Sequence, residues 1–306
     1  MIKDAGDDPD VTDGLAIGAQ VRETPGRFEI EAGAGVGTVT SPGLSVAPGS
    51  PAVNPVPREA ILRELKAGAP GGATVTILAP GGEELARKTL NPRLGIVGGI
   101  SILGTTGRVE PWSVEAMRES LVPQLDVARA RGRRSLVFVL GAKGRRLAEA
   151  AGFDSEAIVE TGNELGWMLE QAVARGFESV TVRGHVGKLA KLAAGIYDTH
   201  SREADARLVT LAAFAGACGV PAEGVRRILR MATAEEAAAF LVELGAGDAL
   251  EEVAREAAVR ARERYELDVR VVILNWEGAV LADSGFEAGP PREADLGSTA
   301  DSGSPS

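Results

Sequence analysis

Polar and apolar positions alternate at the start of the chain. Residues 26–31 alternate and then meet the glycines of residues 33–35, a pattern that predicts a strand followed by a hairpin turn. Residues 36–40 are the expected return strand of that hairpin.

Residues 42–79 combine prolines, which interrupt helices and strands, with one helical pattern and one strand pattern. Residues 42–57 hold five prolines, which predicts an extended connection because proline fixes φ and lacks an N–H. Residues 58–67 have the spacing of a short amphipathic helix, and residues 74–79 read as a strand. We therefore expect a β-rich α+β domain over residues 1–90.

From residue 91 the pattern changes to apolar strands that alternate with helices. A glycine-rich apolar run covers residues 94–102, and residues 135–140 form a continuous apolar run typical of a buried parallel strand. Further strands are expected at 158–160, 179–183 and 267–274. Helices are expected at 113–131, 145–151, 166–175, 186–197, 201–218, 224–231, 235–244 and 247–265.

This alternation predicts an α/β protein whose second domain, residues 91–285, is a Rossmann-like three-layer fold on a parallel sheet. Residues 286–306 are rich in Gly, Ser, Asp and Pro without periodicity, which predicts a disordered tail.

Composition agrees with this class. Glycine is abundant, with 39 residues, and aromatic residues make up 4%, which suits a loop-rich α/β protein better than a β-sandwich. No apolar run could cross a bilayer and no signal pattern follows Met1, so we expect a cytoplasmic protein that does not bind membranes. Cys218 is the only cysteine, which leaves no internal disulfide and no cysteine cluster for a metal.

The net charge of −10 argues against non-specific binding of nucleic acid. Seven arginines and lysines nevertheless lie between Arg129 and Arg146 without an acidic residue. This basic segment is either a solvated helix end and loop or an attractor for a polyanionic small molecule, and the sequence does not decide between them.

Two glycine-rich segments follow apolar runs. Residues 184–188 (Gly-His-Val-Gly-Lys) connect a strand to a helix, where backbone N–H groups and a helix N-terminus can meet an anionic ligand. This is neither a phosphate-binding P-loop nor a dinucleotide fingerprint, so a tight turn is the alternative. Residues 98–107 add two threonines between glycines, and the alternative there is a strand that crosses close to another backbone.

The chain has two histidines, His185 and His200, at the two ends of one predicted helix. A capping or buried hydrogen-bonded imidazole is the default role for each. Too few further ligands surround them for zinc, so no protein-bound metal is expected.

Taken together, four separated motifs resemble those of the CbiD family. They are Lys3–Thr12 (KDAGDDPDVT), Asn54–Arg58 (NPVPR), Asn91–Gly107 (NPRLGIVGGISILGTTG), and the run from Gly184 through Thr199-His200-Ser201 to Arg207. Their order is that of the family, and the resemblance covers roughly residues 3–285.

The resemblance implies S-adenosylmethionine-dependent methylation of C1 of cobalt-precorrin-5B, which gives cobalt-precorrin-6A in anaerobic cobalamin biosynthesis. Cobalt then belongs to the substrate. The partners implied are this small-molecule corrinoid and the methyl donor, with a homo-oligomer left open.

For this reaction we expect three groups of site residues. The methyl donor would lie on the glycine-rich segments, with its ribose near Asn163 or Glu164. The donor-binding residues would be Gly98, Gly99, Gly104, Thr105, Thr106, Gly107, Gly184, His185 and Gly187. The acetate and propionate arms of the corrinoid would meet the cations Lys188, Lys191, Arg183 and Arg202. His200 or Asp198 could manage a proton.

Two departures from the family pattern keep alternatives open. The usual first segment, with a Gly-Tyr-Thr-Thr-Gly-Thr-type motif, is missing, and Asp13 stands where relatives commonly have histidine. The first alternative is therefore a truncated, non-catalytic relative that binds corrinoids. The second, a nucleotide-dependent oxidoreductase, would need a dinucleotide fingerprint that we do not find.

Overall fold

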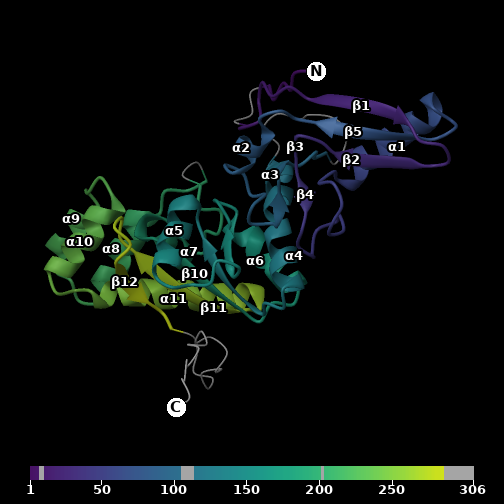
Figure 1. Ribbon diagram of the computed structural model, residues 1–306. Helices are drawn as coiled ribbons and strands as arrows, with labels where there is room; N and C mark the ends of the chain where they lie inside the picture. Colours follow the sequence, from purple (N-terminus) through teal and green to yellow (C-terminus); the bar gives the residue numbers. More distant parts are fainter. Residues whose placement is uncertain (7–9, 105–113, 201–202, 286–306) are drawn as a thin grey trace, which may run out of the picture. The chain divides into compact units, whose positions relative to one another are not determined.

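The computed structural model describes residues 1–6, 10–104, 114–200 and 203–285 (Figure 1). It contains two compact units. The first consists of Met1–Gly184 and Ile196–Ala204, and the second of His185–Gly195 and Asp205–Ser306. The predicted tail, residues 286–306, lies outside the described residues.

The beginning of the first unit is built on a three-stranded sheet. β5 (Ala73–Leu78) lies in the centre, antiparallel to β1 (Gly18–Glu23) and parallel to β2 (Phe28–Ala32). Helix α1 (Pro55–Gly68) packs on this sheet, with Leu65 buried in the same core as Val75 (Figure 1). The helix and the central strand confirm the sequence prediction, whereas β1 was missed because five of its six residues are exposed and only Val21 is strongly apolar.

The predicted hairpin over residues 26–40 is wrong. After β2 the chain forms β3 (Gly35–Val36), which pairs in parallel with β7 (Gly99–Ile100), and β4 (Thr38–Val39), which pairs with β6 (Ile96–Val97). Gly35 has a φ of 76°, and a Cβ there would lie 1.8 Å from the carbonyl oxygen of Ala79. The glycines therefore allow two backbones to pass close to each other, and they do not form the turn of a hairpin.

The helix expected over residues 113–131 is divided in two. Helix α3 (Val114–Leu121) ends just before α4 (Pro123–Ala130), and Ser113 lies outside the described residues. Pro123 sits at the first turn of α4, where its missing N–H does no harm, but inside one long helix it would remove a hydrogen bond.

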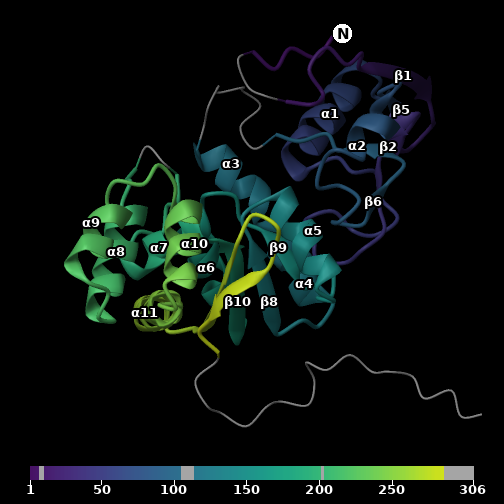
Figure 2. The same ribbon diagram turned by 90° about the vertical axis from the view of Figure 1, so that its left-hand side faces the viewer.

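Three parallel strands follow, and they confirm the mixed α/β class. β8 (Ser135–Val139) lies between β10 (Ser179–His185) and β9 (Ile158–Glu160), and both pairings are parallel (Figure 2). Helices α5 (Ala142–Ala150) and α6 (Leu165–Ala174) connect these strands along the chain. β8 is buried over four of its five residues, as its continuous apolar run predicts.

The second unit is mostly helical, and its longest helix is α11 (Asp248–Tyr265). This helix packs against α7 (Val186–Ala193) and α8 (Arg207–Ala217) (Figure 2). Its buried residues include alanines at 254, 257, 258 and 261. The other elements are α9 (Ala222–Ile228), α10 (Ala234–Glu243), and the antiparallel pair β11 (Asp268–Leu274) and β12 (Val280–Asp283).

Helix α7 is shorter than the predicted 186–197. Its C-cap is Ala194, and Gly195 follows with a φ of 77°. Glycine adopts this left-handed conformation without steric strain and therefore commonly ends a helix. As a result the two histidines do not bracket one helix, because His185 precedes α7 and His200 lies in the first unit.

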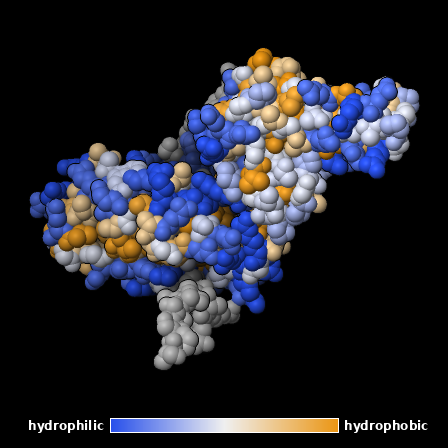
Figure 3. Space-filling view, viewed as in Figure 1, coloured by the Kyte–Doolittle hydropathy of each residue, from blue (hydrophilic) through white to orange (hydrophobic). Residues whose placement is uncertain are grey.

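Among the residues that the structure describes, no helix is long and apolar enough to cross a membrane. Hydrophobic and hydrophilic side chains intermingle over the face of the molecule seen in Figure 3.

Candidate functional site

A polar loop follows the carboxyl end of β9, where open α/β sheets commonly bind ligands. Glu164, at the start of α6, is 5% exposed and accepts a hydrogen bond from Arg118 Nε at 2.5 Å. The Oδ1 atom of Asn163 lies 3.2 Å from the hydroxyl of Thr199, whose own N–H donates to the Asn163 carbonyl at 3.1 Å. These bonds hold the segment around Thr199 against the loop.

Asp198 and His200, the expected proton-handling pair, flank Thr199 in this segment. The carboxylate Oδ1 of Asp198 accepts the backbone N–H of His200 at 2.9 Å. A side chain bonded to the backbone two residues on shapes a turn. This bond orders the backbone of residues 198–200. It joins the Asp198 carboxylate to the His200 backbone and not to the His200 imidazole.

His185, at the strand-to-helix turn of the second unit, is held on two sides. Its Nδ1 atom accepts the N–H of Gly187 at 3.1 Å, which makes His185 the N-cap of α7. Its Nε2 atom lies 2.5 Å from Oε2 of Glu235 at the start of α10. Since Nδ1 accepts a hydrogen bond, Nε2 is the ring nitrogen that bears hydrogen, and the Nε2–H donates a hydrogen bond to Glu235.

The same imidazole stacks on an indole. The rings of His185 and Trp276 have centroids 4.4 Å apart and an interplanar angle of 29°. Trp276 lies in the turn between β11 and β12, and its backbone N–H donates to Oε1 of Glu235 at 3.1 Å. Three separate segments thus contribute one residue each to a single contact group: His185, Glu235 and Trp276.

Glu235 and Trp276 are not among the site residues that the sequence predicts. Glu235 looks like an ordinary acidic residue in the first turn of a helix, and Trp276 looks like part of an Asn-Trp-Glu-Gly turn. Neither local pattern signals an imidazole about 50 or 90 positions earlier.

The expected substrate-binding cations lie in different environments. Arg183 is 6% exposed, with its guanidinium carbon 4.7 Å from the ring centroid of Phe153, and Lys191 is 3% exposed. Lys188 is half-buried in the first turn of α7. Arg202 lies outside the described residues.

The glycine-rich segment 98–107 is only partly described, because Thr105, Thr106 and Gly107 fall outside the described residues. Gly98 is exposed with a φ of 85°, and Gly104 has a φ of 152°. Gly99 is buried, and a Cβ on it would lie 2.0 Å from the carbonyl oxygen of Gly35. For Gly99, close crossing of two backbones is therefore a sufficient reason for glycine. Gly184 is buried within β10.

Acidic residues from other segments pair with much of the basic segment Arg129–Arg146. Arg133 lies within 3 Å of both Asp154 and Glu156, and Arg145 is buried with its Nε 2.9 Å from Glu160. These pairs neutralise part of the positive charge, which weakens the interpretation of the segment as an attractor for a polyanion.

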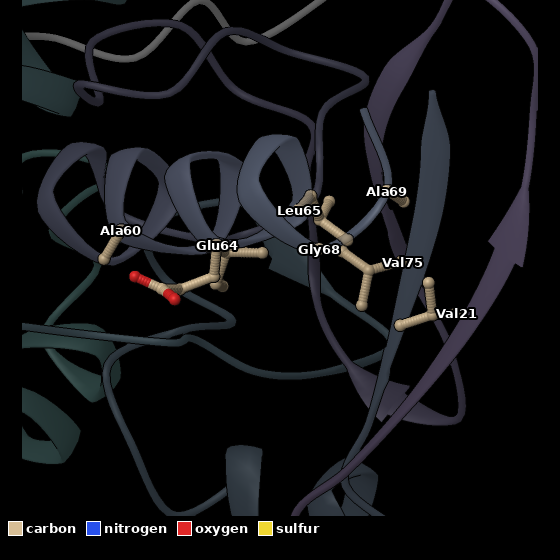
Figure 4. A pocket seen from close by; sticks show the side chains of 8 residues that line it. Val21, Ala60, Glu64, Leu65, Gly68, Ala69 and Val75 are labelled. Carbon is tan, nitrogen blue, oxygen red and sulfur yellow. The ribbon is translucent and has the colours of Figure 1, made fainter. Parts of the chain in front are cut away.

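The first unit has an apolar groove between α1 and the sheet, with a volume of about 540 Å³. Leu65 on the helix faces Val75 and Val21 on the strands, and Glu64 is the charged residue in the lining (Figure 4). A second pocket of about 320 Å³ is lined by Arg93, Arg131, Arg145 and acidic partners, among others. Arg131 and Arg145 of the basic segment line the second pocket, whereas none of the proposed donor-binding, substrate-binding or proton-handling residues lines either one.

No group of three or more histidine, cysteine, aspartate or glutamate residues that could hold a metal ion occurs within the described ranges.

Comparison with known proteins gives matches over both ends of the chain. The CbiD family model matches residues 1–111, and the model of the CbiD C-terminal domain matches residues 198–285. A crystal structure of the cobalamin biosynthesis protein CbiD from Archaeoglobus fulgidus is 31% identical, covers 63% of this chain and 61% of that one, and has a TM-score of 0.29.

Curated relatives match over most of their length. The cobalt-precorrin-5B C(1)-methyltransferase of Moorella thermoacetica is 47% identical over 92% of this chain and 79% of the relative. The proteins of the same name from Thermoanaerobacter sp. (strain X514) and Methanocaldococcus jannaschii are both 43% identical, over 92% of this chain and 79% and 80% of the relatives. With two family models matched in order and identities of this size, the chain belongs to the CbiD family.

Proposed function

We propose that this protein transfers a methyl group from S-adenosylmethionine to C1 of cobalt-precorrin-5B and so forms cobalt-precorrin-6A in cobalamin biosynthesis. The observation that carries this proposal is the 47% identity to a protein named cobalt-precorrin-5B C(1)-methyltransferase over 92% of the chain. The proposed setting is the cytoplasm, with a small-molecule corrinoid as partner and no nucleic acid or membrane.

The chemistry requires positioning above all. When bound, S-adenosylmethionine supplies a methyl group on a sulfonium whose C–S electron pair leaves with sulfur while the ring carbon forms the new C–C bond. An in-line displacement of this kind gains most from holding the reacting atoms at attack distance and in line. The residues expected here suit that role, since a capped strand-to-helix turn and a hydrogen-bonded loop are both rigid supports.

The proposed donor contacts fall on the turn of His185 and Gly187 and on the loop of Asn163 and Glu164. Each group of proposed contacts is held in place within its own unit: His185 has partners on both ring nitrogens, and Glu164 accepts a hydrogen bond from Arg118. Groups that are already oriented lose less entropy when a ligand binds. Gly98, Gly99, Gly104–Gly107 and Gly184 remain part of this proposal.

Four cations are proposed to bind the acetate and propionate arms of the corrinoid: Lys188, Lys191, Arg183 and Arg202. Lys188 is the first to test, because it is half-buried whereas Lys191 and Arg183 are almost fully buried. Asp198 and His200 are proposed to take or return a proton during rearrangement of the ring.

The test is incubation of the protein with cobalt-precorrin-5B and methyl-labelled S-adenosylmethionine. Label should appear in the corrinoid. Lys188→Ala should raise the KM for the corrinoid roughly tenfold, since a hydrogen bond to a charged group contributes about 1.5–3 kcal/mol. The matched control is Lys88→Ala, an exposed lysine that belongs to none of the proposed sites and should leave KM unchanged.

Binding of the corrinoid without transfer of label would favour the alternative of a non-catalytic relative. Equal KM values for the two lysine variants would remove Lys188 from the substrate site but leave the reaction itself in place.

A further inference from the structure

Trp276 is an exposed aromatic residue that is nevertheless anchored. The residue is 53% exposed, although its ring stacks on His185 and its N–H is bonded to Glu235. Tryptophan is enriched at binding surfaces, because its ring supplies apolar contact area while its N–H can bond to water or a ligand.

The turn that carries the indole is rigid. Asn275 closes it twice, because its N–H donates to the Ala279 carbonyl at 3.0 Å and its Oδ1 accepts the Ala279 N–H at 2.8 Å. Gly278 adopts a φ of 93°, which the turn requires. The indole is thus presented at a fixed position, as expected of a preformed stacking surface.

Two carboxylates lie beside Trp276. Oε1 of Glu235 accepts the backbone N–H of Trp276, and the exposed Glu277 is the next residue along the turn. Carboxylates beside the indole attract a cationic ligand more than one that carries several carboxylates. At Trp276 itself a sulfonium compound with a flat purine ring therefore fits better than the acetate and propionate arms of the corrinoid, which are proposed to meet Lys188 in the first turn of α7.

We propose that Trp276 is a binding residue for the methyl donor, with the exposed part of its indole stacked on the adenine ring. This inference rests on the proposed function. His185 and Glu235 are positioning residues in this arrangement: the imidazole supports one side of the indole, and the carboxylate holds both the imidazole Nε2–H and the Trp276 N–H. Nothing in the arrangement requires His185 to exchange a proton.

The experiment is calorimetric binding of S-adenosylhomocysteine, which keeps the adenine but transfers no methyl group. Stacking of a base on an aromatic side chain is worth about 1–3 kcal/mol, so Trp276→Leu should weaken binding by roughly tenfold or more, and Trp276→Phe by less. Leu244→Ala is the control, since Leu244 is 50% exposed at the other end of α10 and should bind like wild type.

Two further probes locate the contact. Adenosine should lose affinity in Trp276→Leu just as S-adenosylhomocysteine does. Among Trp112, Trp167 and Trp276, the fluorescence change caused by the ligand should come from Trp276 and vanish in Trp276→Phe. Glu235→Gln should weaken binding less than Trp276→Leu, because the amide can still accept from the Trp276 N–H.

The outcomes separate the two proposals. If wild type binds S-adenosylhomocysteine and Trp276→Leu binds it equally well, the stacking site is overturned while the methyltransferase proposal stands. If Trp276→Leu instead loses affinity for dicyanocobyrinic acid, a polycarboxylate corrinoid, the assignment to adenine is overturned. Failure of wild type to bind S-adenosylhomocysteine at all overturns the preformed stacking site, whereas the methyltransferase proposal is overturned only if no label reaches the corrinoid.

Discussion

Asp10 shows how two neighbours in one loop set the ionisation of a carboxyl group. Burial raises the pKa of Asp10, but hydrogen bonds from Lys3 Nζ and from the hydroxyl and N–H of Thr12 outweigh it, so the pKa lies below its ordinary value of 3.8. The residues belong to the first CbiD-like motif. The ion pair between Lys3 and Asp10 gives a structural reason for these two residues of the motif.

We expect the contribution of Asp10 to stability to be pH-dependent. A carboxyl group whose pKa is lowered by folding stabilises the folded state fully above its unfolded pKa, and this contribution is lost as the pH falls through the folded pKa. The stability difference between wild type and Asp10→Asn in urea unfolding should therefore be constant near pH 6 and shrink below about pH 4. A difference that stays constant down to pH 3 would contradict the lowered pKa. Glu23→Gln, on the exposed end of β1, is the control.

At the scale of elements, short strands from distant parts of the chain pair where glycines let two backbones approach closely. β3 and β7 are only two residues long, yet they lie against each other because Gly35 and Gly99 carry no Cβ. The sequence analysis proposed donor binding for Gly99 and named a close backbone crossing as the alternative. The geometry supplies a packing reason for this glycine, while its contact with a ligand stays a prediction.

We predict that Gly99→Ala destabilises the protein severely. The added Cβ would lie 2.0 Å from the Gly35 carbonyl oxygen and 2.6 Å from the N–H nitrogen of Val36, so the backbones must separate. Overpacking usually costs about 1–3 kcal/mol, and a clash between two backbones belongs at or above the upper end. The free energy of unfolding in urea measures the loss. The control is Gly71→Ala, where a Cβ meets nothing within 4 Å, and this variant should change the free energy of unfolding little. Equal free energies of unfolding for the two variants would show that the two backbones can separate without loss of stability.

At the scale of the whole molecule, each of the two compact units brings together proposed donor-binding or proton-handling regions that lie far apart in sequence. Trp276 and Glu235 meet His185 only because the turn after β11, the start of α10 and the start of α7 converge. In the first unit the same holds for Asn163 and Thr199. Ligand binding should therefore stabilise tertiary structure as a whole.

We expect S-adenosylhomocysteine to raise the thermal midpoint of the full chain. A ligand at 100 times its Kd stabilises the folded state by about 2.7 kcal/mol, which corresponds to an increase of roughly 5 °C or more for a chain of this size. Differential scanning calorimetry measures the shift. NADH is the matched control and should have no effect; a shift with NADH alone would instead support the oxidoreductase alternative.

The sequence by itself determined the mixed α/β class, the buried run of β8, most helices, and membership of the CbiD family. These features are local: they depend on apolar periodicity, on proline and glycine as breaking signals, and on motifs contiguous in the chain. Tertiary structure decided that residues 35–39 pair with residues 96–100 and that Arg183 and Lys191 are buried. It also decided that Glu235 and Trp276 surround His185. The reason is that strand pairing and side-chain contact depend on where the whole chain places each backbone, and a periodic pattern carries no information about a partner 50 or 90 residues away.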